Sequence, residues 1–293
     1  MNQLDREKMH RNIMKFTLPA LLCAVLVSAC GGGGDSSGNA GVKEAQGNSR
    51  GYAPEVKGTD GKVSVLFASA MQPAASLSAG RLIASSSVDR SLLTQDANGA
   101  FTAFANSGEG GIFAGFRTTG EVFSHMGRVE DVAGSDGVVA IGRWSDGSNS
   151  LGDAYNENQG AVYAVGNPLT LTRSAGTLSC RMVHATQPTS LAGNVPSGKL
   201  NSAVGTLDLG TLQFANVALD VSIGSDQNYA IAMGGLTLGR LSVRQGLSTV
   251  SIAMGAEVTQ PYIALAYAAD LPQTGGINGL VVLKCEKARE SAS

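Results

Sequence analysis

The sequence predicts an all-β protein, and three observations carry that prediction. Apolar residues alternate with other residues at a period of two in many short segments, which is the spacing of a strand with one buried face. Glycine, asparagine, aspartate and proline interrupt these segments every ~8–12 residues, as turns do in sandwiches and barrels. Helical periodicity is almost absent beyond the first 30 residues. The clearest alternating segment is VALDVSI, at residues 217–223.

The first 29 residues have the pattern of a secretory signal peptide. Basic residues precede an apolar run at residues 16–27. At ~1.5 Å per residue this run spans about 18 Å as a helix, well short of the ~30 Å hydrocarbon layer. We therefore expect residues 1–29 to be removed rather than to span a membrane. Met1, Met9 and Met14 are alternative start sites, and a start at Met9 or Met14 leaves a uniformly basic beginning.

Val27-Ser28-Ala29-Cys30 resembles a bacterial lipobox, in which the cysteine is acylated and becomes the new N-terminus. The alternative is an ordinary signal peptide cut after Ala29, with Cys30 incidental. The resemblance implies anchoring in a lipid bilayer by two or three acyl chains, which hold far more durably than one. Gly31, where other lipoproteins carry Asp, resembles proteins that are sent on to the outer membrane.

Residues 30–61 are predicted to form a flexible lipidated tether, because they are rich in Gly, Ser, Asn and charge and have no apolar periodicity. The whole chain has net charge −2. Loss of residues 1–29, with four basic and two acidic side chains, leaves −4. A mildly acidic chain lacks the basic surface that nucleic acid requires, so we expect no nucleic-acid partner.

Four further regions follow the tether. We expect an N-terminal β region at 62–147, a polar loop at 148–160, a small soluble antiparallel up-and-down β-barrel at 161–287 and a disordered tail at 288–293. The barrel is predicted to have about eight strands. The candidate strands are 161–166, 177–185, 203–209, 214–223, 228–233, 236–243, 247–258, 261–269 and 279–286. Nine candidates for about eight places mean that one segment, 161–166 or another, lies outside the barrel.

Two cysteines remain after the signal peptide and Cys30 are set aside. Alternation places both Cys180 and Cys285 on apolar strand faces, one in an early barrel strand and one in the last. In an exported protein we expect a Cys180–Cys285 disulfide that joins these strands, with two buried thiols as the alternative. The barrel interior is predicted to be filled by large side chains: Met182, Leu219, Met233, Ile252 and Met254.

The order of several segments resembles a proteobacterial β-barrel module found at the end of some FecR-domain proteins and in lipoproteins. These segments include DGVVAIGRWSDG (136–147), GTLSCRMVHATQPT (176–189) and INGLVVLKC (277–285). The module is similar in plan to the barrels of transferrin-binding protein B and factor H-binding protein. The resemblance covers roughly residues 136–287 and implies a barrel. It implies no particular ligand, because binding in such proteins resides in loops.

The sequence offers little that indicates catalysis or a cofactor. There is no G-x-S-x-G motif, and Glu130 and Asp131 are predicted to point to opposite sides of a strand into solvent. His184 alternates with Cys180 and Met182, but three residues on one strand cannot converge on a metal ion unaided. The acidic and amide side chains at 146–159 do not follow the EF-hand spacing and predict an exposed loop. We therefore expect neither an enzyme nor a cofactor.

Gly142-Arg143-Trp144 is the most distinctive short motif, and it contains the single tryptophan of the chain. Trp144 and Arg143 are residue types that dominate protein interfaces, so they could form an interface hot spot. Packing within the β-structure is the interpretation that we favour.

The expected function is binding or adhesion through barrel loops by a lipoprotein of the outer membrane. Its partners would be the bilayer, through acylated Cys30, and a protein or small molecule that the sequence does not identify. One alternative is a structural envelope lipoprotein that faces the periplasm. Another is a carrier that holds a small ligand in the barrel interior, as lipocalins do.

Replacing Cys30 tests the anchor. In a Gram-negative host grown with labelled palmitate, the parent chain should take up label and sediment with membranes. Cys30→Ala should lose the label and leave the membrane fraction, because it lacks the acylated thiol. A Cys30→Ala chain that is still labelled and still sediments with membranes would rule out the lipoprotein interpretation.

Overall fold

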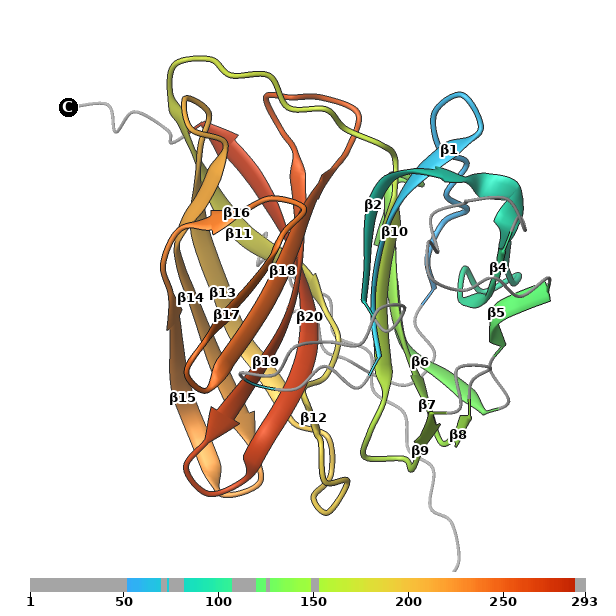
Figure 1. Cartoon of the computed structure of the whole chain (residues 1–293), viewed down its shortest axis with the longest axis vertical. Helices are drawn as coiled ribbons and strands as arrows, with labels where there is room; N and C mark the ends of the chain where they lie inside the picture. The colour runs from blue at the N-terminus through green and yellow to red at the C-terminus, as the bar shows by residue number, and fades with distance from the viewer. Residues whose placement is uncertain are drawn as a thin grey trace, which may run out of the picture. The chain divides into compact units, whose positions relative to one another are not determined.

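Two large antiparallel sheets pack against each other in this computed structural model and share one apolar layer (Figure 1). The structure describes residues 52–69, 73, 82–106, 120–124, 127–148 and 153–287. Within these residues it contains strands and a single 3-10 turn at Arg90–Leu92, so the predicted all-β class is confirmed. The signal peptide, Cys30, the first part of the tether and the tail at 288–293 lie outside the described residues.

The first sheet has five strands in the order β2-β1-β10-β7-β6. Their bounds are β1 Lys62–Ala68, β2 Leu82–Asp89, β6 Arg128–Ser135, β7 Val139–Ser145 and β10 Ala161–Gly166. The sequence prediction began the barrel region at residue 161 and named 161–166 as a segment that could lie outside the barrel. This segment is β10, and it lies between β1 and β7. The second sheet therefore begins at Thr177 rather than at residue 161. Alternation identifies a strand but not the strand with which it pairs.

The second sheet is the curled antiparallel sheet of eight strands that the sequence predicts, in the order β15-β14-β13-β11-β20-β19-β18-β17. Its bounds are β11 Thr177–Ala185, β13 Lys199–Asp208, β14 Gln213–Ile223, β15 Asp226–Met233, β17 Leu241–Arg244, β18 Leu247–Met254, β19 Tyr262–Leu271 and β20 Gly275–Lys287. The short strands β12 (Thr189–Ser190) and β16 (Leu236–Thr237) pair with β20 and β14. Among the described strands no hydrogen-bonded ladder joins β15 to β17, so these two form the edges of the curl.

Smaller sheets complete the N-terminal region. One contains β3 (Leu93–Gln95), β4 (Phe101–Asn106) and β5 (Gly120–Ser124). The other pairs β8 (Gly147–Ser148) with β9 (Ala154–Tyr155).

Three apolar clusters account for the layers. The first fills the inside of the curled sheet, and the second lies between the five-stranded sheet and β3–β4. The third lies between the two large sheets, where Leu66 and Ile141 of the first sheet face Val250 and Leu280 of the second. Strands that separate two clusters are buried on both faces, which explains continuous apolar runs such as AVYAVG in β10.

The filling of the curled sheet agrees with the sequence prediction in part. Leu219 and Met233 lie in its internal cluster, and Met182 packs against that cluster. Ile252 and Met254 were also expected inside, but they lie in the layer between the two sheets. Alternation places Val250, Ile252 and Met254 on one face of β18. It shows that this face is apolar but not whether the inside of the curl or the other sheet covers it.

The predicted tether is shorter than expected at its C-terminal end. Ala53 and Val56 are buried against the five-stranded sheet. The backbone N–H of Ala53 donates to the carbonyl of Asn98 at 3.0 Å, and that of Val56 donates to the Gln95 side chain at 3.1 Å. Packed structure therefore begins by residue 53, nine residues before β1.

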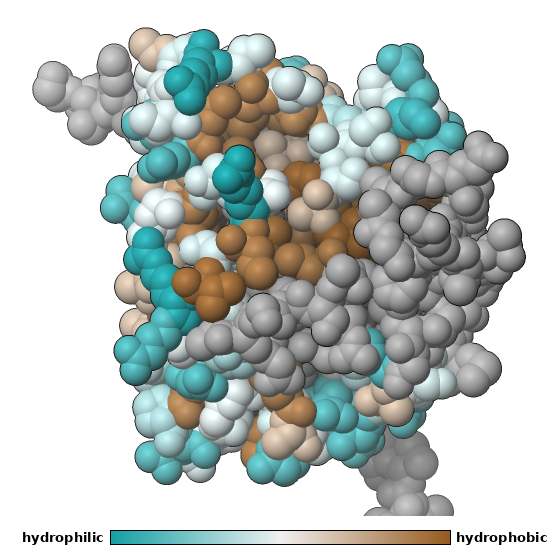
Figure 2. Space-filling view, in the orientation of Figure 1, coloured by the Kyte–Doolittle hydropathy of each residue, from teal (hydrophilic) through white to brown (hydrophobic). Residues whose placement is uncertain are grey.

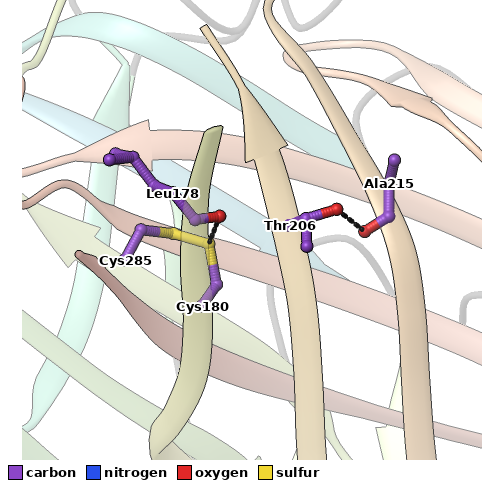
Figure 3. Close-up of a disulfide and its surroundings, with 5 residues drawn as sticks. All are labelled: Leu178, Cys180, Thr206, Ala215 and Cys285. Atoms are coloured by element: carbon purple, nitrogen blue, oxygen red, sulfur yellow. Dashed lines mark hydrogen bonds between the residues drawn. A yellow bond between two sulfur atoms is a disulfide. The ribbon is translucent and has the colours of Figure 1, made fainter. Parts of the chain in front are cut away.

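The predicted disulfide between Cys180 and Cys285 is present, between β11 and β20 (Figure 3). The two cysteines stand directly opposite each other in the ladder. The N–H of Cys285 donates to Pro261 at 2.9 Å, on the side away from β11, so the cysteines form a non-hydrogen-bonded pair, whose side chains lie closest. The bridge thus links strands that are 105 residues apart in sequence.

Removing the disulfide should destabilise the protein strongly. In the chain-entropy account, a link of this span contributes about 4–5 kcal/mol. We expect the Cys180→Ala/Cys285→Ala double variant to unfold at a lower urea concentration than the oxidised parent, with the reduced parent close to the double variant. Equal midpoints for the oxidised parent and the double variant would show that the bridge adds no stability.

Candidate functional site

Arg143 and Trp144 are both inside the protein. Successive residues of β7 point to opposite faces, so Trp144 enters the cluster above the five-stranded sheet while Arg143 points into the layer between the two large sheets. The Trp144 indole N–H donates to the carbonyl of Phe101 at 2.7 Å. Both residues are at most 1% exposed, which agrees with packing rather than with a surface hot spot.

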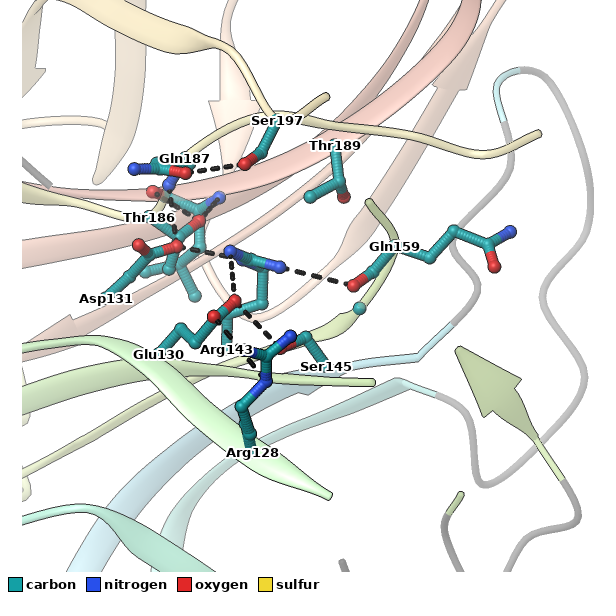
Figure 4. A network of polar contacts seen from close by, with 12 residues as sticks. Arg128, Glu130, Asp131, Arg143, Ser145, Gln159, Thr186, Gln187, Thr189 and Ser197 are labelled. Atoms are coloured by element: carbon teal, nitrogen blue, oxygen red, sulfur yellow. Dashed lines mark hydrogen bonds and ion pairs between the residues drawn. The ribbon is translucent and has the colours of Figure 1, made fainter. Parts of the chain in front are cut away.

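Arg143 is surrounded by partners (Figure 4). Its guanidinium pairs with Asp131 and with Glu130, at 2.8 Å in each case, and donates to the carbonyl of Gln159 at 3.2 Å. The prediction that Glu130 and Asp131 point into solvent on opposite sides is therefore wrong.

A β-bulge is the reason for that error. The β6–β7 ladder pairs Glu130 with Arg143 and then Ala133 with Ile141, so two residues of β6 stand opposite Gly142. Asp131 has φ 56°, the left-handed conformation that Asp tolerates better than most residues. The extra residue turns both carboxylates toward one guanidinium.

The same carboxylate connects the two sheets. Asp131 accepts the backbone N–H of Gln187, in the segment after β11, at 2.9 Å. Other hydrogen bonds join the sheets nearby: Gln159 to Leu191 (2.7 Å), Asn156 to Gly193 (3.0 Å), Asn278 to Gly160 (3.3 Å) and Ser135 to His184 (2.6 Å). We call this set, together with Asp131–Gln187, the polar joint. The loop at 148–160, expected to be simply exposed, contributes Asn156 and Gln159 to it.

The contacts of the polar joint hold the two sheets together. Burial lowers the pKa of His184, which favours its neutral form, and its imidazole contacts Ser135. Cys180, which shares its strand, is committed to the disulfide. Within the described residues no group of three or more His, Cys, Asp or Glu side chains is arranged to hold a metal ion.

A cavity of about 430 Å³ lies at the end of the curled sheet where β11 begins and β13 ends. Its walls come from the β10–β11 connection (167–176), the β13–β14 connection (209–212), the β16–β17 turn, β2 and β18. Most of the lining is apolar, from Ala84, Leu169, Leu171, Leu212, Leu238 and Ile252. Figure 2 shows hydrophobic surface on this face of the molecule.

The polar side chains that line this cavity are hydroxyl groups and one arginine. Hydroxyl groups line it at Ser86, Thr170, Thr211 and Thr237. Among the described lining residues the one charged side chain is Arg173, which is exposed. Among the described residues no carboxylate oxygen lies within 4 Å of its guanidinium. The cavity therefore combines an apolar wall with an unpaired positive charge.

Backbone strain occurs at the same place. Leu212 has φ 58°, a conformation that is unfavourable for a branched side chain. Its N–H donates to the carbonyl of Asp208 at 2.8 Å, and the Asp208 carboxylate accepts the N–H of Thr211 at 2.8 Å. These hydrogen bonds with Thr211 hold the pKa of Asp208 below its usual value. The tight turn keeps Leu212 half-buried in the cavity wall.

Sequence reasoning placed binding in the barrel loops but named no residue of this cavity. The only signal in the sequence is that Leu169 and Leu171 are apolar residues in a connection between strands, where polar residues are usual. The close approach of β2 to this end of the curled sheet has no sequence signal, because it depends on how the two sheets pack.

A scan against protein-family models and searches of curated proteins and of solved structures found no match for this chain. The resemblance to the barrel module of transferrin-binding protein B and factor H-binding protein therefore stays a prediction. In the described part of the chain, no helix has the length and apolar character needed to cross a membrane.

Asp131 and Asp146 allow a matched test of the polar joint, because each aspartate has a positive φ and each pairs with an arginine. Asp131→Asn keeps the shape and the backbone tolerance but weakens the pairing of buried Arg143, and we expect it to cost about 3 kcal/mol of unfolding free energy. Asp146→Asn, at φ 50° and in an exposed pair with Arg128, should cost less than about 1 kcal/mol. Urea denaturation measures both, and equal losses would contradict the role given to Asp131.

Proposed function

We propose that this chain is a non-enzymatic binding module of the outer membrane, anchored through acylated Cys30, that binds its partner at the loop end of the curled sheet. The observation that carries the binding role is the cavity at that end. Three connections meet there with β2 and β18 to form a concave, mostly apolar surface. Concave apolar sites with a few polar groups are where proteins hold small ligands.

The anchor is supported by the lipobox pattern and by the polar sequence that follows it. Residues 30–52, which precede the packed structure, provide about 23 residues of leash with an r.m.s. reach of roughly 25 Å. This length would hold the folded part clear of a lipid surface.

The carrier alternative, with a ligand inside the curled sheet, has less support. The internal cluster contains Phe214, Ile263, Leu265 and Tyr267, all fully buried. Tyr267 also covers Gly279, which stands opposite it on β20. An interior filled by large side chains is a packed core, as in other small barrels.

Trypsin treatment of intact cells distinguishes the surface-exposed module from the periplasm-facing structural protein. The leash contains Lys43 and Arg50, so trypsin should release the folded part into the medium from intact cells. A double Lys43→Gln/Arg50→Gln variant should stay on the cells, and a periplasmic marker protein should stay intact. Release that occurs only after the outer membrane is permeabilised would contradict the surface-exposed module and favour the structural alternative.

A further inference from the structure

We propose that the cavity at the loop end binds an anionic single-chain amphiphile of the fatty-acid class. The apolar chain lies along the leucine-rich wall, and the acid group lies at Arg173. This inference rests on the proposed function, because it names the ligand of the same site.

Size and lining favour an apolar chain. A volume of about 430 Å³ falls in the range of ~300–1,000 Å³ that is usual for small-ligand sites. Leu169, Leu171 and Leu238 remain half-exposed in the wall, although leucine is normally among the most buried residues. An alkyl chain in the cavity would remove this surface from water, which is the main driving force for binding an apolar ligand.

Charge selects an acid group at one end of that chain. Arg173 lines the cavity, and no described carboxylate pairs with it. The nearby Asp208 carboxylate is instead engaged by the backbone N–H of Thr211. A guanidinium binds a carboxylate through two parallel hydrogen bonds, and the hydroxyl of Thr170, which lines the same cavity, adds a neutral donor.

The strained turn is an independent observation at the same site. Leu212 holds its side chain in the cavity wall at φ 58°, where glycine or asparagine would be less strained. A strained backbone conformation persists only where the surrounding contacts hold it in place. Such conformations are concentrated at active sites and binding sites. Leu212 therefore serves the cavity rather than the turn.

The way the two sheets are held together gives a ligand access. The hydrogen bonds of the polar joint connect β6 and the loop at 156–160 to the second sheet. Among the described residues no hydrogen bond joins β2 to β17 or β18, and Leu82, Ala84 and Ile252 meet there through apolar contact alone. One backbone hydrogen bond also joins the sheets where β10 ends, from the N–H of Gly255 to the carbonyl of Asn167 at 3.0 Å. An alkyl chain that entered between β2 and β18 would break none of the hydrogen bonds of the polar joint.

Photo-crosslinking tests the proposal on the acylated chain reconstituted in phosphatidylcholine vesicles. The probes are lauric acid carrying a diazirine and its methyl ester, with crosslinked peptides identified by mass spectrometry. We expect the acid to label residues 167–173 and 236–254. Arg173→Gln should reduce labelling by the acid about tenfold, which corresponds to the loss of one charge-assisted pair, and should leave the ester unchanged.

Two further variants keep the test decisive. Arg240→Gln, an exposed arginine at the same end that does not line the cavity, should leave labelling by the acid at the parent level. Leu212→Gly should weaken labelling by both probes while the urea midpoint stays near that of the parent, because relief of strain offsets the lost side chain. Labelling outside the cavity, or equal effects of Arg173→Gln and Arg240→Gln, would overturn the inference. Trypsin release from cells would be unaffected by that failure, so the proposed function would stand or fall separately.

Discussion

The apolar layer between the two large sheets is the constraint on which the rest of the structure depends. Burying it requires β7 and β10 on one side, and β18, β19 and β20 on the other, to be buried on both faces, because each of these strands also borders a second cluster. Isolated, either sheet would expose an apolar face far larger than a monomeric protein normally leaves in water. The two sheets therefore form one cooperative structure rather than a barrel with an independent appendage.

The polar joint gives that apolar contact its orientation. Hydrophobic surfaces attract without direction, whereas the Arg143 guanidinium requires Asp131 and Glu130 at defined positions. Removing an ion pair from water costs several kcal/mol, so such a group stabilises the fold only when every donor and acceptor has a partner. Asp131 meets that condition by binding Arg143 on its own sheet and the N–H of Gln187 on the other.

The cavity lies at the end of the curled sheet, away from the hydrogen bonds of the polar joint. Hydrogen bonds join the sheets along β6 and the loop at 156–160, while the contact between β2 and β18 is apolar and is continued by the leucines of the loop end. The strained turn at Leu212 and the unpaired charge of Arg173 occur at this place. The proposed binding role accounts for these features together.

The sequence by itself determined what depends on local pattern. Period-two alternation identified nearly all the strands of the curled sheet, and the shared apolar faces of Cys180 and Cys285 identified the strands that the disulfide joins. The lipobox pattern at Cys30 is likewise local, and it stays a prediction because it lies outside the described residues.

Tertiary structure alone decided the partners. Pairing placed β10 in the first sheet, and packing turned Ile252 and Met254 outward, because alternation defines a face without saying what covers it. A bulge brought Glu130 and Asp131 to one guanidinium, since one extra residue shifts the parity of every side chain on one side of it. The cavity is lined by segments more than 160 residues apart in sequence, from β2 to β18. The residue pattern within a strand does not predict that two such distant segments lie side by side.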